Sequence, residues 1–325
     1  MMRLLSRRAV LSLLMAAVGA MGLISGAVSA SSEASNTELA TDGSIARFQV
    51  GNAEVIALSD GTFPIDLFSV LQGLSADQVQ AYLDQTFEIN PVETSITAFL
   101  VRMQGHLMLV DTGCGTFCGD VGGKLLRSLA LTGYSPEDIT DVLITHMHGD
   151  HEGGLALHGK RAFPNAVVYI HQADIGRFLN PDNLRDGVIR QLDWDRAQAS
   201  VALYRAAGQL KTSSGPTQLL PGIKAIPMAG HTPGATFYQL HSAGEQLYLI
   251  GDMIHIRAVQ LPAPEVTVGY DLNPSKARAE RLKWFQTFAQ EGALLAAPHM
   301  NFPGVGHLRV QDQGYRWIPA AYHNR

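Results

Sequence analysis

The densest group of polar side chains in this chain is a set of three histidines and one aspartate within residues 146–151, directly after the short apolar run 142–144. Such a run, bounded by polar residues, predicts a buried strand. Side chains two apart on a strand share a face, so His146 and His148 should emerge side by side at its end. A turn at Gly149 would bring Asp150 and His151 back towards them. Imidazoles and a carboxylate gathered in this way suit zinc and similar divalent metals, so the sequence predicts a metal site.

Three further polar residues end apolar runs in the second half of the chain. His231 lies in a turn sequence after the strand-like run 223–228, Asp252 follows the run 246–250, and His299 ends the run 293–298. All three could therefore converge on one edge of a sheet. Together with the first group they make five histidines and two aspartates. Seven ligands are too many for one tetrahedral zinc, so the set predicts two metals with a carboxylate between them.

This pattern carries a resemblance. The order His-x-His-x-Asp-His, followed by His231, Asp252 and His299, resembles the complete dinuclear ligand set of the metallo-β-lactamase superfamily. Segments 58–62, 93–97, 110–113 and 302–307 also resemble methyl parathion hydrolase and its relatives, the organophosphorus hydrolase and lactonase-like subgroup. The similarity runs in order from about Phe48 to about Pro319. It implies an α/β fold, the αββα sandwich, with a dinuclear metal site at one edge of the two sheets.

The resemblance also implies a role for each ligand. One ion would be held by His146, His148 and His231, and the other by Asp150, His151 and His299, with Asp252 as the bridge. Two divalent cations, expected to be Zn²⁺, would lower the pKa of a bridging water and make hydroxide available as the nucleophile. Asp150 also lies close enough to handle a proton, so Asp150 and Asp252 are the catalytic candidates. We therefore expect a metal-dependent hydrolase of organophosphate triesters, aryl esters or lactones.

Several alternatives remain open. The main activity could be that of a lactonase, acting on N-acyl homoserine lactones or aryl lactones. A mononuclear-iron oxygenase would leave several ligands idle, and β-lactamases with two zincs usually differ at the bridge position. A non-catalytic binding protein on this scaffold would normally have lost ligands. A nitrophenolate leaving group needs no general acid, and the sequence offers no obvious one.

Four aromatic residues are candidates for the substrate pocket, and core packing is the alternative for each. Phe117 matches an aromatic position of the family, and Phe63, Phe178 and Trp194 fall in neighbouring segments. Around residues 185–199 the chain departs from methyl parathion hydrolase. That departure weakens the assignment of Trp194 and the case for parathion-type activity.

Four residues near the predicted site have open roles. Asp111 could hold a ligand histidine by a hydrogen bond to its free ring nitrogen, or simply cap a turn. His255 could line the pocket, although the sequence favours a packed histidine. Cys114 and Cys118 could form a disulfide in an exported protein, but nothing in the metal set needs a cysteine and two free thiols are favoured.

The N-terminus has the form of an export signal. Arginines precede an apolar run from Ala9 to Ile24, and small residues end at Ala30, so residues 1–30 are predicted to be a signal peptide. Ser6-Arg7-Arg8 also fits a twin-arginine signal, so the route is left open between that and ordinary secretion. The protein should be periplasmic or secreted. A flexible leader, 31–42, would precede a single hydrolase domain, 43–325.

The net charge of the chain limits the classes of partner that it can bind. Removing residues 1–30 takes away three arginines and no acids, so the formal charge moves from −5 to −8. An acidic chain without a basic block argues against nucleic acid and anionic membranes. We expect a small-molecule ester, lactone or phosphotriester as the partner, and relatives suggest a possible homodimer.

The remaining pattern alternates strands and helices. Strands are predicted at 51–60, 93–103, 106–110 and 167–170, and helices at 75–86, 123–131, 190–207 and 274–290.

Overall fold

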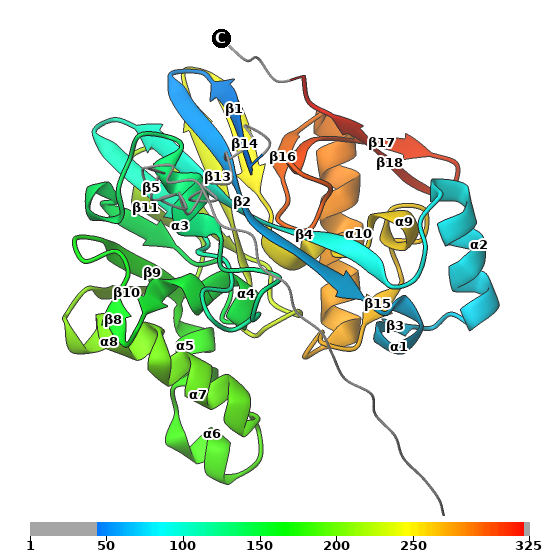
Figure 1. Ribbon diagram of the computed structural model, residues 1–325. Helices are drawn as coiled ribbons and strands as arrows, with labels where there is room; N and C mark the ends of the chain where they lie inside the picture. Colours follow the sequence, from blue (N-terminus) through cyan, green and yellow to red (C-terminus); the bar gives the residue numbers. More distant parts are fainter. Residues whose placement is uncertain (1–43, 322–325) are drawn as a thin grey trace, which may run out of the picture. The chain divides into compact units, whose positions relative to one another are not determined.

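The protein is described here by a computed structural model covering residues 44–321, so the predicted signal peptide and leader lie outside the described residues. These residues belong to one compact unit. No helix among them is long and apolar enough to cross a membrane. Two seven-stranded sheets form the framework, as Figure 1 shows.

The first sheet contains the strands of the N-terminal half. Its spatial order is β1 (Ile45–Val50), β2 (Ala53–Ile65), β4 (Val92–Met103), β5 (His106–Val110), β6 (Asp141–Leu143), β9 (Val167–His171) and β10 (Leu210–Ser213). Pairing is antiparallel as far as β5, and β5, β6, β9 and β10 are parallel to one another. The carboxyl ends of these parallel strands therefore share one edge of the sheet.

The second sheet contains the strands of the C-terminal half. Its order is β11 (Thr217–Leu220), β12 (Ile223–Pro227), β13 (Thr236–Ser242), β14 (Glu245–Leu249), β16 (Leu294–Ala296), β17 (Val305–Gln311) and β18 (Gly314–Pro319). Only β14 and β16 pair in parallel. Their carboxyl ends, which precede Asp252 and His299, thus lie at the same edge.

The core is layered because the central strands are buried on both faces. In β4, Phe99 and Val101 pack between the sheets, while Ala98 and Leu100 face the helices outside the first sheet. Alternate side chains of a strand point to opposite faces, so a strand buried on both faces must be apolar throughout. This requirement explains the nearly continuous apolar run in β4.

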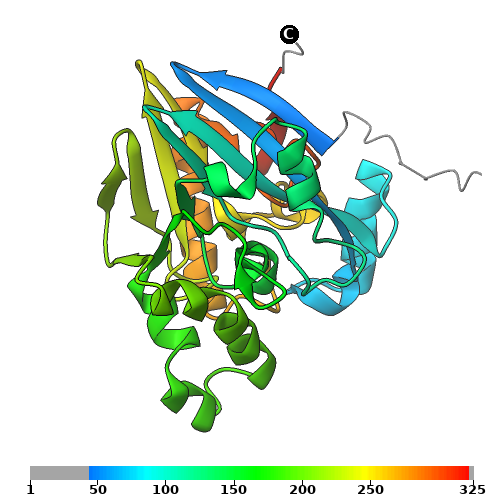
Figure 2. The same ribbon diagram turned by 60° about the vertical axis from the view of Figure 1, so that its left-hand side comes forward.

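Helices cover both outer faces. The first sheet is covered by α3 (Leu125–Ala130), α5 (Gln172–Phe178), α7 (Gln191–Ala199) and α8 (Val201–Ala206), and the second by α10 (Pro274–Glu291). In Figure 2, α10 runs behind the yellow strands of its sheet. A smaller apolar cluster joins α1 (Leu67–Val70), α2 (Ala76–Thr86), α9 (Arg257–Gln260), β3 (Leu71–Gln72) and β15 (Thr267–Val268). The predicted αββα sandwich is therefore the observed fold.

Most predicted elements have bounds within a few residues of those observed. The prediction of one continuous helix over 190–207 is wrong. The segment is two helices, α7 and α8, separated at Ser200, whose φ of −113° and ψ of −81° leave the helical region. The hydroxyl of Ser200 donates to the carbonyl of Arg196 at 2.7 Å and also contacts the buried carboxyl of Glu152. A serine that hydrogen-bonds back to the preceding turn favours such a break. In the two large sheets, strands β1, β10, β11, β13, β17 and β18 were not predicted.

Candidate metal centre

The predicted ligands all lie after the carboxyl ends of strands, at the shared edge of the two sheets. His146 and His148 follow β6, and Asp150 and His151 lie in the short helix α4 (Gly149–Glu152). The other three follow β12, β14 and β16, respectively His231, Asp252 and His299. The two halves of the chain thus meet at one point.

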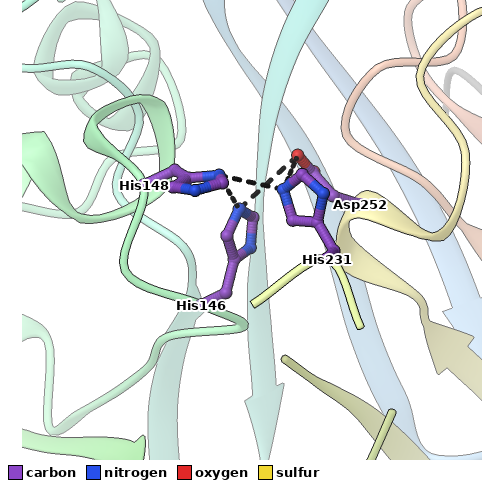
Figure 3. A group of neighbouring side chains, drawn as sticks. All are labelled: His146, His148, His231 and Asp252. Atoms are coloured by element: carbon purple, nitrogen blue, oxygen red, sulfur yellow. Dashed lines mark hydrogen bonds and ion pairs between the residues drawn. The ribbon is translucent and has the colours of Figure 1, made fainter. Parts of the chain in front are cut away.

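Three histidines and Asp252 form the first cluster, which Figure 3 shows. Nδ1 of His148 lies 3.1 Å from Nε2 of His146 and 2.9 Å from Nε2 of His231. Oδ2 of Asp252 lies 3.2 Å from Nε2 of His231 and 3.5 Å from Nε2 of His146. Four ligand atoms therefore surround one point.

The second cluster uses the other oxygen of the same carboxylate. Oδ1 of Asp252 lies 3.0 Å from Nε2 of His151 and 3.1 Å from Nε2 of His299. Oδ2 of Asp150 lies 3.4 Å and 3.5 Å from the same two nitrogens. Asp252 thus directs one oxygen at each cluster, which is the arrangement of a carboxylate bridging two cations.

The donor set fits two divalent ions. The side chains of His146, His151, His231, Asp252 and His299 are almost fully buried. Nε2 of His151 and Oδ1 of Asp252 are buried without a hydrogen-bond partner, although they lie only 3.0 Å apart. Buried polar atoms without partners are costly, and bound cations would satisfy these two. One ion would be held by His146, His148 and His231, the other by Asp150, His151 and His299, and both by Asp252.

Hydrogen bonds to the far ring nitrogens orient three of the histidines. Nδ1 of His151 donates to Oδ2 of Asp111, Nδ1 of His231 donates to Oδ1 of Asp271, and Nδ1 of His299 donates to the carbonyl of Ser95, each at 2.9 Å. A proton held on Nδ1 leaves Nε2 as a lone-pair donor for a metal. Asp111 therefore has the supporting position that was one of its two predicted roles.

Two aspartates that sequence reasoning missed hold the ligand loops together. Asp174 accepts hydrogen bonds from the backbone of Met147 and Gly234 and from the hydroxyl of Thr232, so it links the loop of His146 and His148 to that of His231. Asp271 holds His231, and Arg281 of α10 lies 3.8 Å from it. No signal in the sequence pointed to either aspartate, because each binds loops that are distant from it in the sequence and not close neighbours.

Electrostatics favours the protonation state that metals require at Asp150 and His148, but not at His231. Burial opposes ionisation of Asp150, but His151 and His299 hold the pKa of its carboxyl below its usual range. Burial, reinforced by His231, lowers the pKa of His148 to about 3, so its imidazole is neutral. Although burial opposes the charge, hydrogen bonds to Asp252 and Asp271 raise the pKa of His231 to about 9. Metal binding at His231 would therefore release a proton.

A cavity of about 270 Å³ opens onto the ligands, and one predicted pocket aromatic lines it. The wall includes Phe63, His255, Tyr270, Arg190, Asp193, Arg196 and Cys118. The Phe63 ring stands edge-on to His299, with centroids 5.9 Å apart. A larger cavity, of about 550 Å³ between α2, α9 and the β17–β18 hairpin, contains none of the predicted ligands.

The other three predicted pocket aromatics lie outside the cavity wall. Phe178 is only 2% exposed and packs in the core against His148, and Trp194 packs against the same core. Phe117 does not line the cavity either, but its ring lies under Arg196. Core packing therefore accounts for Phe178 and Trp194.

His255 and Tyr270 bring polar groups into the cavity. His255 has both of its predicted roles, because its side chain is packed and only 3% exposed, yet it also lines the cavity. Its Nε2 donates to Oδ2 of Asp252 at 2.8 Å. Its Nδ1 is buried without a partner. Within residues 44–321, the Tyr270 hydroxyl has no hydrogen-bond partner, and burial together with Asp252 raises the pKa of this phenol. The site thus contains a hydroxyl donor that the sequence did not reveal.

The preference for free thiols at Cys114 and Cys118 is wrong. The two form a disulfide with Cα atoms 5.6 Å apart. Gly115, with a φ of +53°, lets the chain turn tightly enough for the pair to meet. A Cβ at Gly115 would lie 2.4 Å from the carbonyl oxygen of Gly153, so the closed loop packs directly behind α4.

Comparison with known proteins agrees with this geometry. The sequence profile of the Metallo-beta-lactamase superfamily matches residues 92–299. The chain belongs to the metallo-β-lactamase superfamily. It is accordingly a metal-dependent hydrolase.

Individual relatives indicate the range of activities. An N-acyl homoserine lactonase of Bacillus sp is 24% identical over 70% of this chain and 87% of its own length. A ribonuclease Z of Methanothermobacter thermautotrophicus is 29% identical over 66% of this chain and 74% of its own length.

Two solved structures are similar over 87% of this chain and all of their own length. They are the hydrolase AbOPH of the β-lactamase superfamily, with 33% identity and a TM-score of 0.82, and the dizinc quorum-quenching lactonase AidC, with 28% identity and a TM-score of 0.76. The specific likeness to methyl parathion hydrolase stays a prediction.

Proposed function

We propose that this enzyme hydrolyses lactones and aryl esters at a dinuclear zinc centre. The observation that carries the proposal is the Asp252 carboxylate, which directs Oδ2 at one histidine cluster and Oδ1 at the other. When bound, two divalent cations lower the pKa of a shared water and polarise the carbonyl oxygen of the substrate. The similarity to a dizinc lactonase supports zinc as the metal.

The protein's own groups complete this chemistry. His255 donates from Nε2 to Asp252 and so fixes the plane of the bridging carboxylate. Asp150 turns Oδ2 towards His151 and His299, which leaves Oδ1 to accept a proton from the attacking water. The hydroxyl of Tyr270 can donate to the departing oxygen of the substrate.

The cavity favours a compact carboxylic ester. Its volume of about 270 Å³ lies just below the usual range for ligand sites. An aliphatic lactone leaves as an alkoxide, which benefits from a nearby donor, and Tyr270 provides one. The similarity to N-acyl homoserine lactonases supports the same class, and aryl lactones or aryl acetates fit between Phe63 and Tyr270.

Organophosphate triesters are the second candidate. They would be attacked by the same nucleophile, and an aryl leaving group needs no donor. The aromatic edge of Phe63 beside His299 suits an aryl group. Because Trp194 and Phe178 lie outside the cavity, the aromatic rim expected for parathion-type substrates is reduced to Phe63 and Tyr270. We therefore propose phosphotriester turnover as a side reaction.

The other classes are less well supported. A mononuclear-iron oxygenase would leave one of the two clusters without a metal, and a β-lactamase would not need the Asp252 bridge. Ribonuclease Z is among the relatives, but a formal charge of −5 and a small cavity argue against an RNA substrate.

The proposed test is a substrate comparison with the zinc-loaded protein. We expect an N-acyl homoserine lactone and an aryl acetate to show kcat/KM values at least about tenfold above that of a dimethyl aryl phosphotriester, equal to about 1.4 kcal/mol of transition-state stabilisation. Loss of all three activities in Asp252→Asn would tie them to one site. A protein with two bound ions that turns over neither lactone nor aryl ester would disprove the proposal.

We also propose export, with cleavage after Ala30. The disulfide between Cys114 and Cys118 supports an oxidising compartment. N-terminal sequencing of exported protein should begin at Ser31 or within a few residues of it, whereas an intact N-terminus in the periplasmic fraction would indicate an anchor.

A further inference from the structure

We propose that Arg196 forms an anion subsite in the active-site cavity, so that the enzyme prefers esters or lactones carrying a carboxylate away from the scissile bond. This inference rests on the proposed hydrolase function and names its substrate class more closely. It follows from how the guanidinium is held, from the ion pairs on the same wall, and from the charge around it.

The Arg196 guanidinium is held in place from three directions. Nη2 donates to the carbonyl oxygen of Phe117 at 3.2 Å, and the guanidinium carbon lies 5.3 Å above the centre of the Phe117 ring. Nη1 lies close to Gly149, since a Cβ at that position would be 3.0 Å from it. Gly149 separates two predicted ligands, so the guanidinium stands beside the metal centre. A cation fixed in this way loses little conformational freedom when it binds an anion.

The loop beneath Arg196 is itself constrained. Phe117 lies within the five-residue ring closed by the disulfide of Cys114 and Cys118. The backbone of this loop touches Gly153, where a Cβ would meet the carbonyl oxygen of Cys114 at 2.2 Å. The ring that supports the guanidinium is therefore fixed to the segment that follows α4.

Arg196 differs from the second arginine of the cavity wall in its partners. Arg190 forms a double hydrogen bond with Asp193, from Nε and Nη2, each at 2.8 Å. Among the described residues, Arg196 makes no ion pair with a carboxylate. The buried carboxyl of Glu152 is hydrogen-bonded by the Ser200 hydroxyl and forms no ion pair with Arg196. The charge of Arg196 is thus available to a ligand.

Charge in the cavity favours an anion as its ligand. The wall contributes Asp150 and Asp252, which the two expected divalent ions would outweigh, and the pair of Arg190 and Asp193, which is neutral. Arg196 then adds a positive charge inside a small cavity, where attraction is weakly screened. A carboxylate is the common organic anion with the planar geometry that a guanidinium recognises.

The test compares two esters that differ only in charge. 3-Carboxyphenyl acetate and 3-carbamoylphenyl acetate have similar shapes, and release of the phenol reports both. We expect the zinc-loaded enzyme to show a KM for the acid about tenfold below that for the amide, as one charge-assisted hydrogen bond allows. Arg196→Gln should abolish this KM ratio, and Arg196→Lys should restore part of it. The ratio in the native enzyme should also shrink as salt is added.

Arg190→Gln is the matched control, because it removes an arginine from the same wall whose charge is already neutralised by Asp193. Its KM ratio should remain in favour of the acid. Equal KM values for the two esters in the native enzyme, or an unchanged ratio in Arg196→Gln, would overturn the subsite.

Direct binding separates failure of the subsite from failure of the proposed function. If neither ester is cleaved, the hydrolase proposal fails, and calorimetry with the zinc-loaded protein still decides on Arg196. 3-Hydroxybenzoate should then bind native protein about tenfold more tightly than Arg196→Gln, whereas 3-hydroxybenzamide should not distinguish them. Equal affinity of 3-hydroxybenzoate for both proteins would overturn the subsite.

Discussion

Replacement of Asp271 by asparagine should weaken one metal site selectively. Both oxygens of this buried carboxylate act as acceptors. Oδ1 accepts from Nδ1 of His231 at 2.9 Å, and Oδ2 accepts from the backbone of Val268 at 3.2 Å and faces the Arg281 guanidinium at 3.8 Å. Although burial opposes ionisation, the hydrogen bond from His231 and the surrounding positive charge hold the pKa of Asp271 below its usual range.

Asparagine has the same shape but cannot serve both sides. If its oxygen faces His231, its amide NH₂ points at the donors Val268 and Arg281. If the amide is turned over, the NH₂ opposes Nδ1–H of His231, and the ring must move its proton to Nε2, the atom that should bind the metal. Either orientation leaves two donors in contact, so substitution disturbs His231 without creating a cavity.

The expected magnitude follows from the bond that is lost. A hydrogen bond to a buried charged group contributes about 1.5–3 kcal/mol, which corresponds to a loss of roughly 10- to 100-fold in metal affinity, as found for residues that orient metal-binding histidines. Titration of metal-free protein with zinc against a chromophoric chelator would resolve the two binding steps. One step should weaken by this factor in Asp271→Asn, and the other should keep its native affinity.

Asp111→Asn provides the matched control for the opposite cluster. Asp111 accepts from His151 through Oδ2 and from the backbone of Thr145 through Oδ1, so asparagine there should weaken the site of Asp150, His151 and His299 instead. Two native affinities in Asp271→Asn, or equal weakening of both steps, would refute the idea that Asp271 acts through His231.

Three further predictions concern the bridge, the leaving group and a buried acid. Asp252→Ala should lower occupancy of both sites from the two ions per chain expected by elemental analysis, because both clusters share that carboxylate; retention of one full site would contradict bridging. For aryl acetates, kcat/KM should rise as the pKa of the phenol falls, and Tyr270→Phe should slow lactones about tenfold more than nitrophenyl esters, since a phenol hydrogen bond helps only the poorer leaving group; equal losses would exclude this role. Burial raises the pKa of Glu152 from 4.5 to about 7, so the folded state binds this proton more tightly. The corresponding stability is complete below pH 4.5 and is lost as pH rises through 7, and Glu152→Gln should remove about 3 kcal/mol of this pH dependence in chelator-treated protein. If the free energy of unfolding changed with pH in the same way in both proteins between pH 4 and 8, this prediction would be contradicted.

The sequence, through the family resemblance that it carries, predicted the sandwich, and it predicted the seven residues that the structure brings together. The predicted ligands lie at or just after the ends of apolar runs, and the end of a strand can be recognised from neighbouring residues alone. The same holds for the helix caps at Ser75 and Asn273. Local order was therefore enough to predict that His146, His231 and Asp252 meet at a sheet edge.

Only the tertiary structure decided which side chains support or surround that site. Asp174, Asp271 and Tyr270 act across distances in the sequence that no local pattern spans, such as the 40 residues between His231 and Asp271. Whether an aromatic side chain lines the cavity or packs behind its wall depends on how whole helices pack. Phe63 therefore lines the cavity, whereas Phe178 is buried behind His148. Local sequence sets where a strand ends, but the direction of a side chain towards a distant loop depends on the packing of both sheets.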